Sequence, residues 1–170
     1  IIGEIEANID RAAQNEFEAF QVVVVGPATG VALFASPLTG PGQPITGVHL
    51  YREALITCPH PSAKDGAAGP WPDPLVPDRD EFDGEKRSAF PFDVPDGQSR
   101  VVFVDVLVPR GQAPGNYSGR VTVSSQQGSV EVEVELTVWP FELPSTASLR
   151  NYYSLQYGAL PCGVVGAGRL

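Results

Sequence analysis

Hydrophobic and polar residues alternate most strictly in the last third of the chain. Every second position from 130 to 138 is Val or Leu, and the positions between them are Glu131, Glu133, Glu135 and Thr137. A period of two sustained over nine residues predicts a β-strand with one buried side and one solvent-facing side. The connection at 125–128 predicts a hairpin between this strand and a preceding one at 117–124.

Four further stretches are rich in β-branched and aromatic residues, which favours strands at 17–25, 30–35, 45–56 and 100–108. Gly26 and Pro27 separate the first two, so a hairpin between them is expected. The stretch 45–56 alternates well enough for one longer strand with Val48 and Leu50 on the same side, and a short helix is the alternative. The run at 100–108 is almost continuously apolar, as in a strand that is buried on at least one face.

Proline and glycine decide the fold class. The 170 residues include 17 Pro and 18 Gly, which argues against a helical bundle. The sequence predicts an all-β fold, an antiparallel two-sheet β-sandwich of the immunoglobulin or fibronectin type. Eight prolines interrupt residues 58–96, which we interpret as a long Pro-rich insertion. Its apolar side chains should hold it in place by packing; they are Trp71, Leu75, Val76, Phe82, Phe90 and Phe92.

Charge and hydropathy narrow the choice of partners. Twenty acidic and eleven basic residues give a net charge of −9, which repels nucleic acid and anionic lipid. The chain has no apolar run of 18 residues, so no membrane span is expected. It opens at Ile1 without a basic leader, and we interpret it as a processed or excised piece of a larger protein.

Cysteine and histidine offer few candidates for chemistry. Cys58 and Cys162 are the only cysteines, and they form no C-x-x-C pair that would indicate zinc. They are expected either to stay as separate thiols or to form one disulfide in an exported protein. His49 and His60 are expected to be structural and solvated, respectively, because the sequence has no G-x-S-x-G nucleophile motif to accompany them.

The densest group of carboxylates lies within the Pro-rich insertion. Oxygen ligands at this spacing could hold calcium, and the weak candidate ligands are Asp78, Asp80 and Asp83. The group departs from the EF-hand pattern at Phe82, and Lys86 and Arg87 follow at once. A salt-bridged loop without metal is therefore the preferred interpretation, and no cofactor is expected.

Aromatic residues and glutamates supply the remaining candidates. Trp71 and Trp139 are weak candidates for a sugar platform, alone or with Tyr152 and Tyr153, although loop anchoring and core packing would also explain the two tryptophans. Glycosidases need paired carboxylates, and the available acids are Glu16, Glu18, Glu131, Glu133 and Glu135. The last three share the wet side of one strand, where they are expected to aid solubility and oppose edge pairing. No catalytic residue is therefore assigned.

Several ordered blocks of sequence resemble one family. They are RAAQNEFEAFQVVV at 11–24, LYREALI at 50–56, GPWPDPLVPDRD at 69–80, EKRSAFPFDVPDGQSRVVFVDVLVP at 85–109, APGNYSGRVTV at 113–123 and LTVWPFELPSTASL at 136–149. Together they resemble the N-terminal domain of large bacterial proteins similar to glycoside hydrolase family 123, whose C-terminal domain was long labelled as of unknown function.

The resemblance implies a larger parent protein. In such proteins the N-terminal sandwich precedes a (β/α)8 barrel, and an Asp-Glu pair in the barrel is implied to cleave an N-acetyl-β-galactosaminide with the help of the substrate. Neither carboxylate maps onto this chain. The resemblance places a sandwich domain at 1–143 and, at 144–170, a linker with the first strand of a missing barrel at 151–158. A complete barrel needs about 250 residues.

Three functions follow as hypotheses. The favoured one is a non-catalytic sandwich that packs against and stabilises a glycosidase-like barrel, which would be its partner in the same parent chain. The alternative is a stand-alone carbohydrate-binding or adhesion module with glycans as partners. The third is a small hydrolase that uses the acids at 78–85 with calcium. In each case we expect an exported protein, located in the periplasm, on the cell surface or outside the cell.

Overall fold

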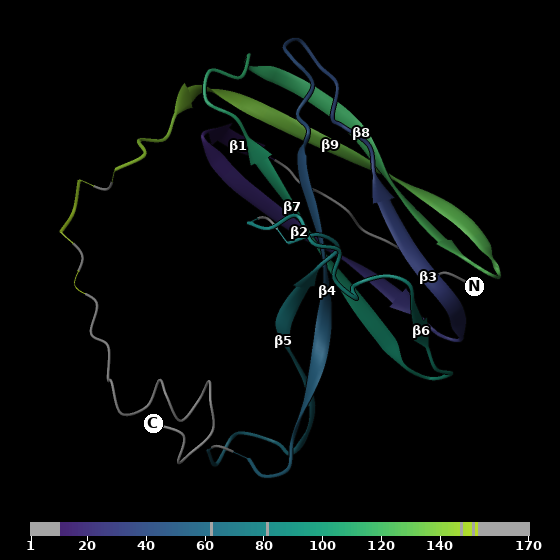
Figure 1. Ribbon diagram of the computed structural model, residues 1–170. Coiled ribbons are helices and arrows are strands. Elements are labelled where there is room, and N and C mark those ends of the chain that lie inside the picture. Colours follow the sequence, from purple (N-terminus) through teal and green to yellow (C-terminus); the bar gives the residue numbers. More distant parts are fainter. Residues whose placement is uncertain (1–10, 62, 81, 147, 151, 153–170) are drawn as a thin grey trace.

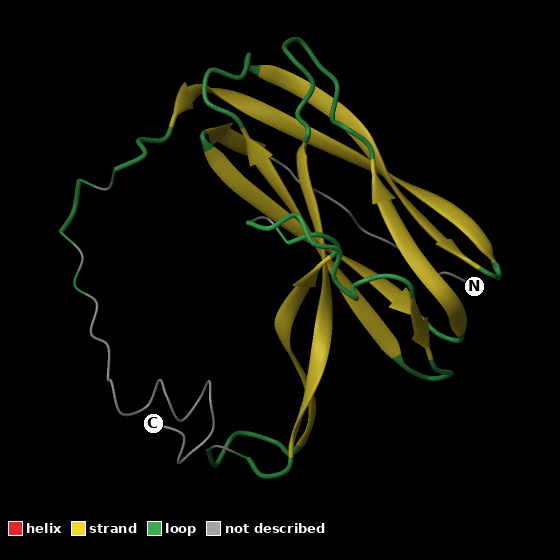
Figure 2. Cartoon of the chain, viewed as in Figure 1, coloured by secondary structure: helices red, strands yellow, loops and turns green. Residues whose placement is uncertain are grey.

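The computed structural model describes residues 11–61, 63–80, 82–146, 148–150 and 152. These residues form two stacked β-sheets without helices, which confirms the predicted β-sandwich (Figures 1 and 2). A five-stranded sheet has the order β1-β9-β8-β3-β6, and a four-stranded sheet has the order β2-β7-β4-β5. The strands are β1 (Arg11–Gln14), β2 (Glu16–Val25), β3 (Ala28–Ala35), β4 (Gly47–Cys58), β5 (Gly69–Pro77), β6 (Phe92–Val94), β7 (Ser99–Val108), β8 (Gly115–Ser125) and β9 (Gly128–Glu142).

The alternating segment near the end of the chain folds as predicted. β8 and β9 form an antiparallel hairpin whose register pairs Ser125 with Gly128 and Val121 with Val132. The even-numbered side chains of β9 from Val132 to Val138 are buried, whereas Glu131, Glu133 and Glu135 are exposed. The stretch at 45–56 is also a strand, β4, and the helical alternative for it is wrong.

The predicted hairpin between residues 17–25 and 30–35 is wrong. β2 pairs with β7 in the four-stranded sheet, whereas β3 pairs with β8 and β6 in the other sheet. Gly26, at the crossing between the sheets, lies so close to Pro95 that an added Cβ would be 2.1 Å from the Pro95 carbonyl oxygen. Glycine therefore allows the chain to change sheets here instead of turning back on itself.

The Pro-rich segment at 58–96 contains two strands, β5 and β6, that the sequence pattern did not predict. β5 contains four prolines, and it lies at the edge of its sheet, where only one side needs hydrogen bonds. The apolar side chains of the segment are buried only in part, and Val76 packs against the core. Phe90 and Phe92 are buried in the core, but Trp71, Leu75 and Phe82 are 47 %, 44 % and 98 % exposed.

The core lies between the two sheets and consists largely of valine. β2 and β7 direct every second valine inward, and these side chains meet the inward-facing residues of β3, β8 and β9. The fully buried Tyr117 connects the core to the loops at one end of the sandwich. Its hydroxyl donates to the Ala113 carbonyl at 2.8 Å and accepts hydrogen bonds from Gln112 Nε2 at 2.8 Å and from the Gly42 amide at 3.0 Å.

The first strand, β1, and the end of the last strand, β9, lie side by side near Asn15. Asn15 itself lies between β1 and β2. β1 pairs in parallel with the end of β9. Asn15 has φ of 61°, a left-handed conformation that asparagine tolerates, and its Nδ2 donates to the Leu143 carbonyl at 2.8 Å. The Leu143 amide in turn donates to the Gln14 carbonyl at 2.9 Å. The chain therefore leaves the sandwich at a fixed point.

The sequence predicts no membrane-spanning segment, and the structure tests this prediction for helices. The described part of the chain contains no helix that could cross a lipid bilayer.

Candidate functional site

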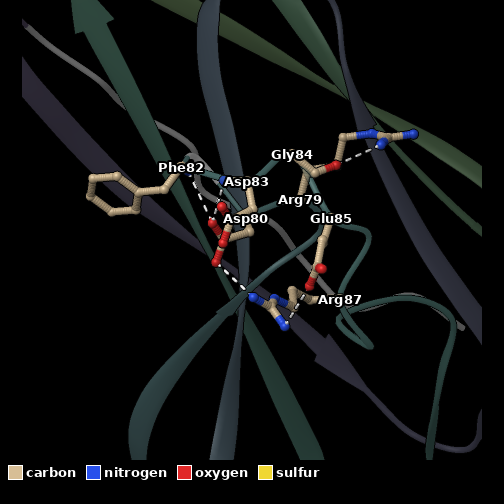
Figure 3. A network of polar contacts seen from close by, with 7 residues as sticks. All are labelled: Arg79, Asp80, Phe82, Asp83, Gly84, Glu85 and Arg87. Atoms are coloured by element: carbon tan, nitrogen blue, oxygen red, sulfur yellow. Dashed lines mark hydrogen bonds and ion pairs between the residues drawn. The ribbon is translucent and has the colours of Figure 1, made fainter.

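The acidic loop between β5 and β6 is built around Asp80 (Figure 3). Asp80 Oδ1 accepts the amides of Phe82 and Asp83, each at 3.0 Å, and Oδ2 accepts Arg87 Nη2 at 3.0 Å. Arg87 Nη1 also pairs with Glu85 at 3.2 Å. The Asp83 amide, followed by Arg87 and the Phe82 amide, lowers the pKa of Asp80 below its ordinary value of 3.8.

These contacts bear directly on the calcium hypothesis. Both oxygens of the Asp80 carboxylate already have donors, and an arginine supplies the compensating charge. Among the described residues, no three His, Cys, Asp or Glu side chains gather in a way that could hold a metal ion. Glu81 lies outside the described residues. The loop forms an ion-paired turn in which Asp78 and Asp83 do not join Asp80 as ligands.

The two tryptophans occupy separate places. Trp71 lies in β5, and its Nε1 donates to the Ala67 carbonyl at 2.9 Å, which agrees with loop anchoring. Trp139 lies in β9 and is 38 % exposed, so its expected packing in the core is wrong. It falls on the same side of the strand as the three exposed glutamates. Trp71 and Trp139 belong to different sheets and form no shared platform.

Trp139 does have an aromatic neighbour that the sequence analysis missed. Phe141 stacks on it, with ring centroids 5.5 Å apart and an angle of 23° between the planes. Phe141 is 49 % exposed. Two-residue spacing on an extended strand places both rings on one side, and this W-x-F spacing was the signal in the sequence. Tyr152 is 90 % exposed, and Tyr153 lies outside the described residues.

The glutamates of β9 line an open hollow of about 780 Å³ from a single strand, so they do not face one another across it. Glu131, Glu133 and Glu135 lie along β9, where Glu131 pairs with Arg120 at 3.2 Å. Glu16 and Glu18 lie in β2 of the other sheet. Partial burial, followed by the charge of Glu16, raises the pKa of Glu18 above its ordinary value of 4.5. The Glu16 carboxylate accepts a hydrogen bond from the Ala13 amide, so it satisfies a backbone donor.

The two histidines and Cys58 lie in β4 or directly after it. His49 lies in β4 and His60 in the exposed loop that follows it. Cys58 is half-buried at the end of β4, and Cys162 lies outside the described residues, so the disulfide remains a prediction.

One open cleft of about 560 Å³ lies where β4 separates from β7. Arg52 and Arg100 line it, and the Arg52 guanidinium lies 5.9 Å from the centre of the Phe92 ring. The two carboxylates of this cleft, Glu53 and Asp93, accept hydrogen bonds from Gln21 Nε2 and the Gly30 amide, respectively. The cleft therefore contains no nucleophile beside a base, and the sequence analysis did not anticipate it.

Comparison with known proteins identifies the fold. No protein-family model matches this sequence, and no curated protein does. Among solved structures, the chain is similar to a family 123 glycoside hydrolase from Clostridium perfringens, determined in a study of glycolipid glycan hydrolysis, with a TM-score of 0.62 and 14 % identity. The match covers 79 % of this chain and only 23 % of the hydrolase chain. At this identity the likeness is one of fold.

Proposed function

We propose that this chain is a non-catalytic accessory sandwich of a larger glycoside hydrolase-like protein, and that it packs against and stabilises the catalytic (β/α)8 barrel. One observation carries the proposal: the matching fold occupies 79 % of this chain but 23 % of a much longer hydrolase chain. A domain of this size, attached to a domain that performs the chemistry, accounts for both numbers.

The arrangement of acids supports a non-catalytic role. A glycosidase needs two carboxyl groups on opposite sides of the scissile bond, about 5–10 Å apart. The described glutamates instead lie along single strands, and Asp80 is engaged by Arg87. We further propose a sandwich domain at 1–143, a linker with the first barrel strand at 144–170, and an exported parent protein.

The test is enzymatic. The 170-residue chain and the product of its complete gene should both be assayed on aryl N-acetyl-β-galactosaminide and related aryl N-acetylhexosaminides. We expect hydrolysis by the complete product and none by the 170-residue chain. Turnover by the 170-residue chain at rates typical of an enzyme would refute the non-catalytic role. Inactivity of the complete product across the panel would refute the hydrolase context.

The stacked pair Trp139 and Phe141 supports a second candidate, a carbohydrate-binding module. Exposed, nearly parallel rings present a flat apolar surface of the kind on which a pyranose ring can stack. Titration calorimetry against a glycan panel tests this function. Binding should be lost in Trp139→Ala, whereas Trp71→Ala serves as a control on the other sheet. If the unmodified chain binds no glycan of the panel, this candidate function is refuted.

A further inference from the structure

The outer face of the four-stranded sheet carries many apolar side chains, with Gln21, Asp105 and His49 as polar positions on β2, β7 and the paired part of β4. β2 and β7 pair so that Phe17 lies opposite Leu107, and Val23 lies opposite Val101, on this outer side. Tyr51 of β4 lies opposite Phe103, and the two rings meet edge to face with centroids 6.5 Å apart. Large apolar side chains on this side are substantially exposed: Phe17 60 %, Val23 39 %, Val25 42 % and, on β5, Leu75 44 %.

The outer face of the five-stranded sheet has the opposite character. β8 and β9 present register pairs of polar residues there, among them Arg120 with Glu133 and Ser118 with Glu135. An antiparallel sheet normally presents such a polar surface to water. The large apolar residues on this side are Phe34, which is 66 % exposed beside Thr122, and the stacked pair Trp139 and Phe141 near the end of β9. Along the glutamate-bearing part of β8 and β9, this face is therefore more polar than the outer face of β2 and β7.

The sequence of β7 carries the same information. Its residues from Val101 to Val108 are apolar except for Asp105. The inward set, from Val102 to Val108, is completely buried, and the outward set is only half-buried. A continuous apolar run is typical of a strand covered on both faces. Exposed apolar surface of this extent on a soluble domain marks an interaction site.

The exit of the chain lies at the edge of this apolar face. Asn15 Nδ2 bonds to the Leu143 carbonyl at 2.8 Å and to Ser145 Oγ at 3.4 Å. Phe17 follows Asn15 by two residues, about 7 Å along an extended strand. Figure 1 shows the segment after β9 leaving the sandwich on the side of β2 and β7. Leu143 and Ser145 are therefore held beside Asn15, two positions from Phe17.

We propose that the outer face of β2, β7 and β4 is the docking surface for the domain that follows the sandwich in the same polypeptide, with Phe17 at the edge nearest the linker. This inference rests on the proposed function and specifies the surface on which it depends. The fixed exit at Leu143 delivers the linked domain to this face and away from the glutamates of β9.

The size of the face favours a tethered partner over a free one. Three strands about 4.8 Å apart and about 33 Å long present roughly 500 Å². An interface between domains of one chain buries about 600–1,500 Å² in total, or about 300–750 Å² on each side. A stable complex between separate molecules typically needs about 800 Å² on each side. The face is therefore adequate for a linked domain and small for a second copy of the chain.

Hydroxyl-radical footprinting tests this surface, because it measures the solvent exposure of individual side chains. The 170-residue chain and the product of the complete gene should be oxidised in parallel. Phe17 is 60 % exposed in the 170-residue chain, and burial in an interface should reduce this exposed fraction to about 10 %. Its oxidation should therefore be about sixfold slower in the complete product. Phe34, which is 66 % exposed on the other outer face, is the internal control and should react at the same rate in both proteins.

Four outcomes would overturn the docking surface. The first is equal oxidation of Phe17 in both proteins. The second is protection of Phe17 in the 170-residue chain that grows with protein concentration, which would identify a second copy as the occupant. The third is protection in that chain at every concentration, which would identify its own last residues. The fourth is a reading frame that closes at Leu170.

The same samples separate this inference from the proposed function. Active hydrolase with a freely reactive Phe17 would overturn the surface and keep the function. An inactive complete product with a protected Phe17 would keep the surface and overturn the hydrolase context.

Discussion

Removing a single oxygen atom from the core should measurably destabilise the sandwich. In Tyr117→Phe the ring still fills its site, but the hydroxyl that joins three loop groups is gone. Gln112 Nε2 keeps a second acceptor, the Gln43 carbonyl at 2.6 Å. The Ala113 carbonyl and the Gly42 amide lose their hydrogen bonds to Tyr117. The loss of stability therefore comes from these two backbone groups.

The expected loss follows from these two groups. Leaving a buried polar group unsatisfied costs about 1–3 kcal/mol, and partial burial of Gly42 and Ala113 places each towards the lower half of that range. We therefore expect the free energy of unfolding to fall by about 3 kcal/mol. For a chain of this length, that corresponds to a drop in Tm of about 6–12 °C.

Urea denaturation and calorimetry at neutral pH measure this change. The matched control is Tyr152→Phe, because Tyr152 is 90 % exposed and its substitution should change stability by less than about 0.5 kcal/mol. A loss below about 0.5 kcal/mol in Tyr117→Phe, with an unchanged denaturant slope, would refute the assignment of the hydroxyl as the connection between these loops.

Three further predictions concern charge, metal and backbone packing. Burial and the charge of Glu16 raise the pKa of Glu18, so the ionised carboxylate of Glu18 destabilises the fold at pH 7. Glu18→Gln should therefore raise Tm at pH 7. The gain should vanish below about pH 4, where Glu18 is protonated in both the folded and the unfolded chain. A gain that persists at pH 3 would contradict this. Neither calcium nor EDTA should shift Tm, because Asp80 already has its donors; a calcium-dependent rise would revive the metal hypothesis. Gly40→Ala should cost about 1–3 kcal/mol, since its Cβ would lie 2.6 Å from a backbone oxygen, whereas Gly66→Ala should be nearly neutral in the same melting experiment.

Side-chain periodicity predicted those strands whose two sides differ. β9 alternates because one side meets the core and the other meets water, so its register could be read directly. Trp139 was assigned to the core although it falls in the phase of the glutamates, and strict use of the same period would have placed it outside.

Other features depended on partners that are distant in the sequence. β5 could not be recognised from its prolines, because they are acceptable only at a sheet edge, and edge position is a property of the whole sheet. The crossing at Gly26 has the composition of a hairpin turn, and only the close approach of Pro95 distinguishes it. The cleft at Arg52 and Arg100 likewise lies where β4 and β7 separate. Neither strand's own sequence pattern indicates where this separation occurs.

The parallel pairing of β1 with β9 gives the sandwich a mechanical property. If the chain is pulled at Arg11 and at Glu142 in opposite directions, the two strands must slide past each other along their length. Their hydrogen bonds are then loaded in shear and must yield together, whereas an antiparallel pair pulled from one end opens one bond after another. The sandwich should therefore transmit tension between whatever is attached to its two ends without coming apart first.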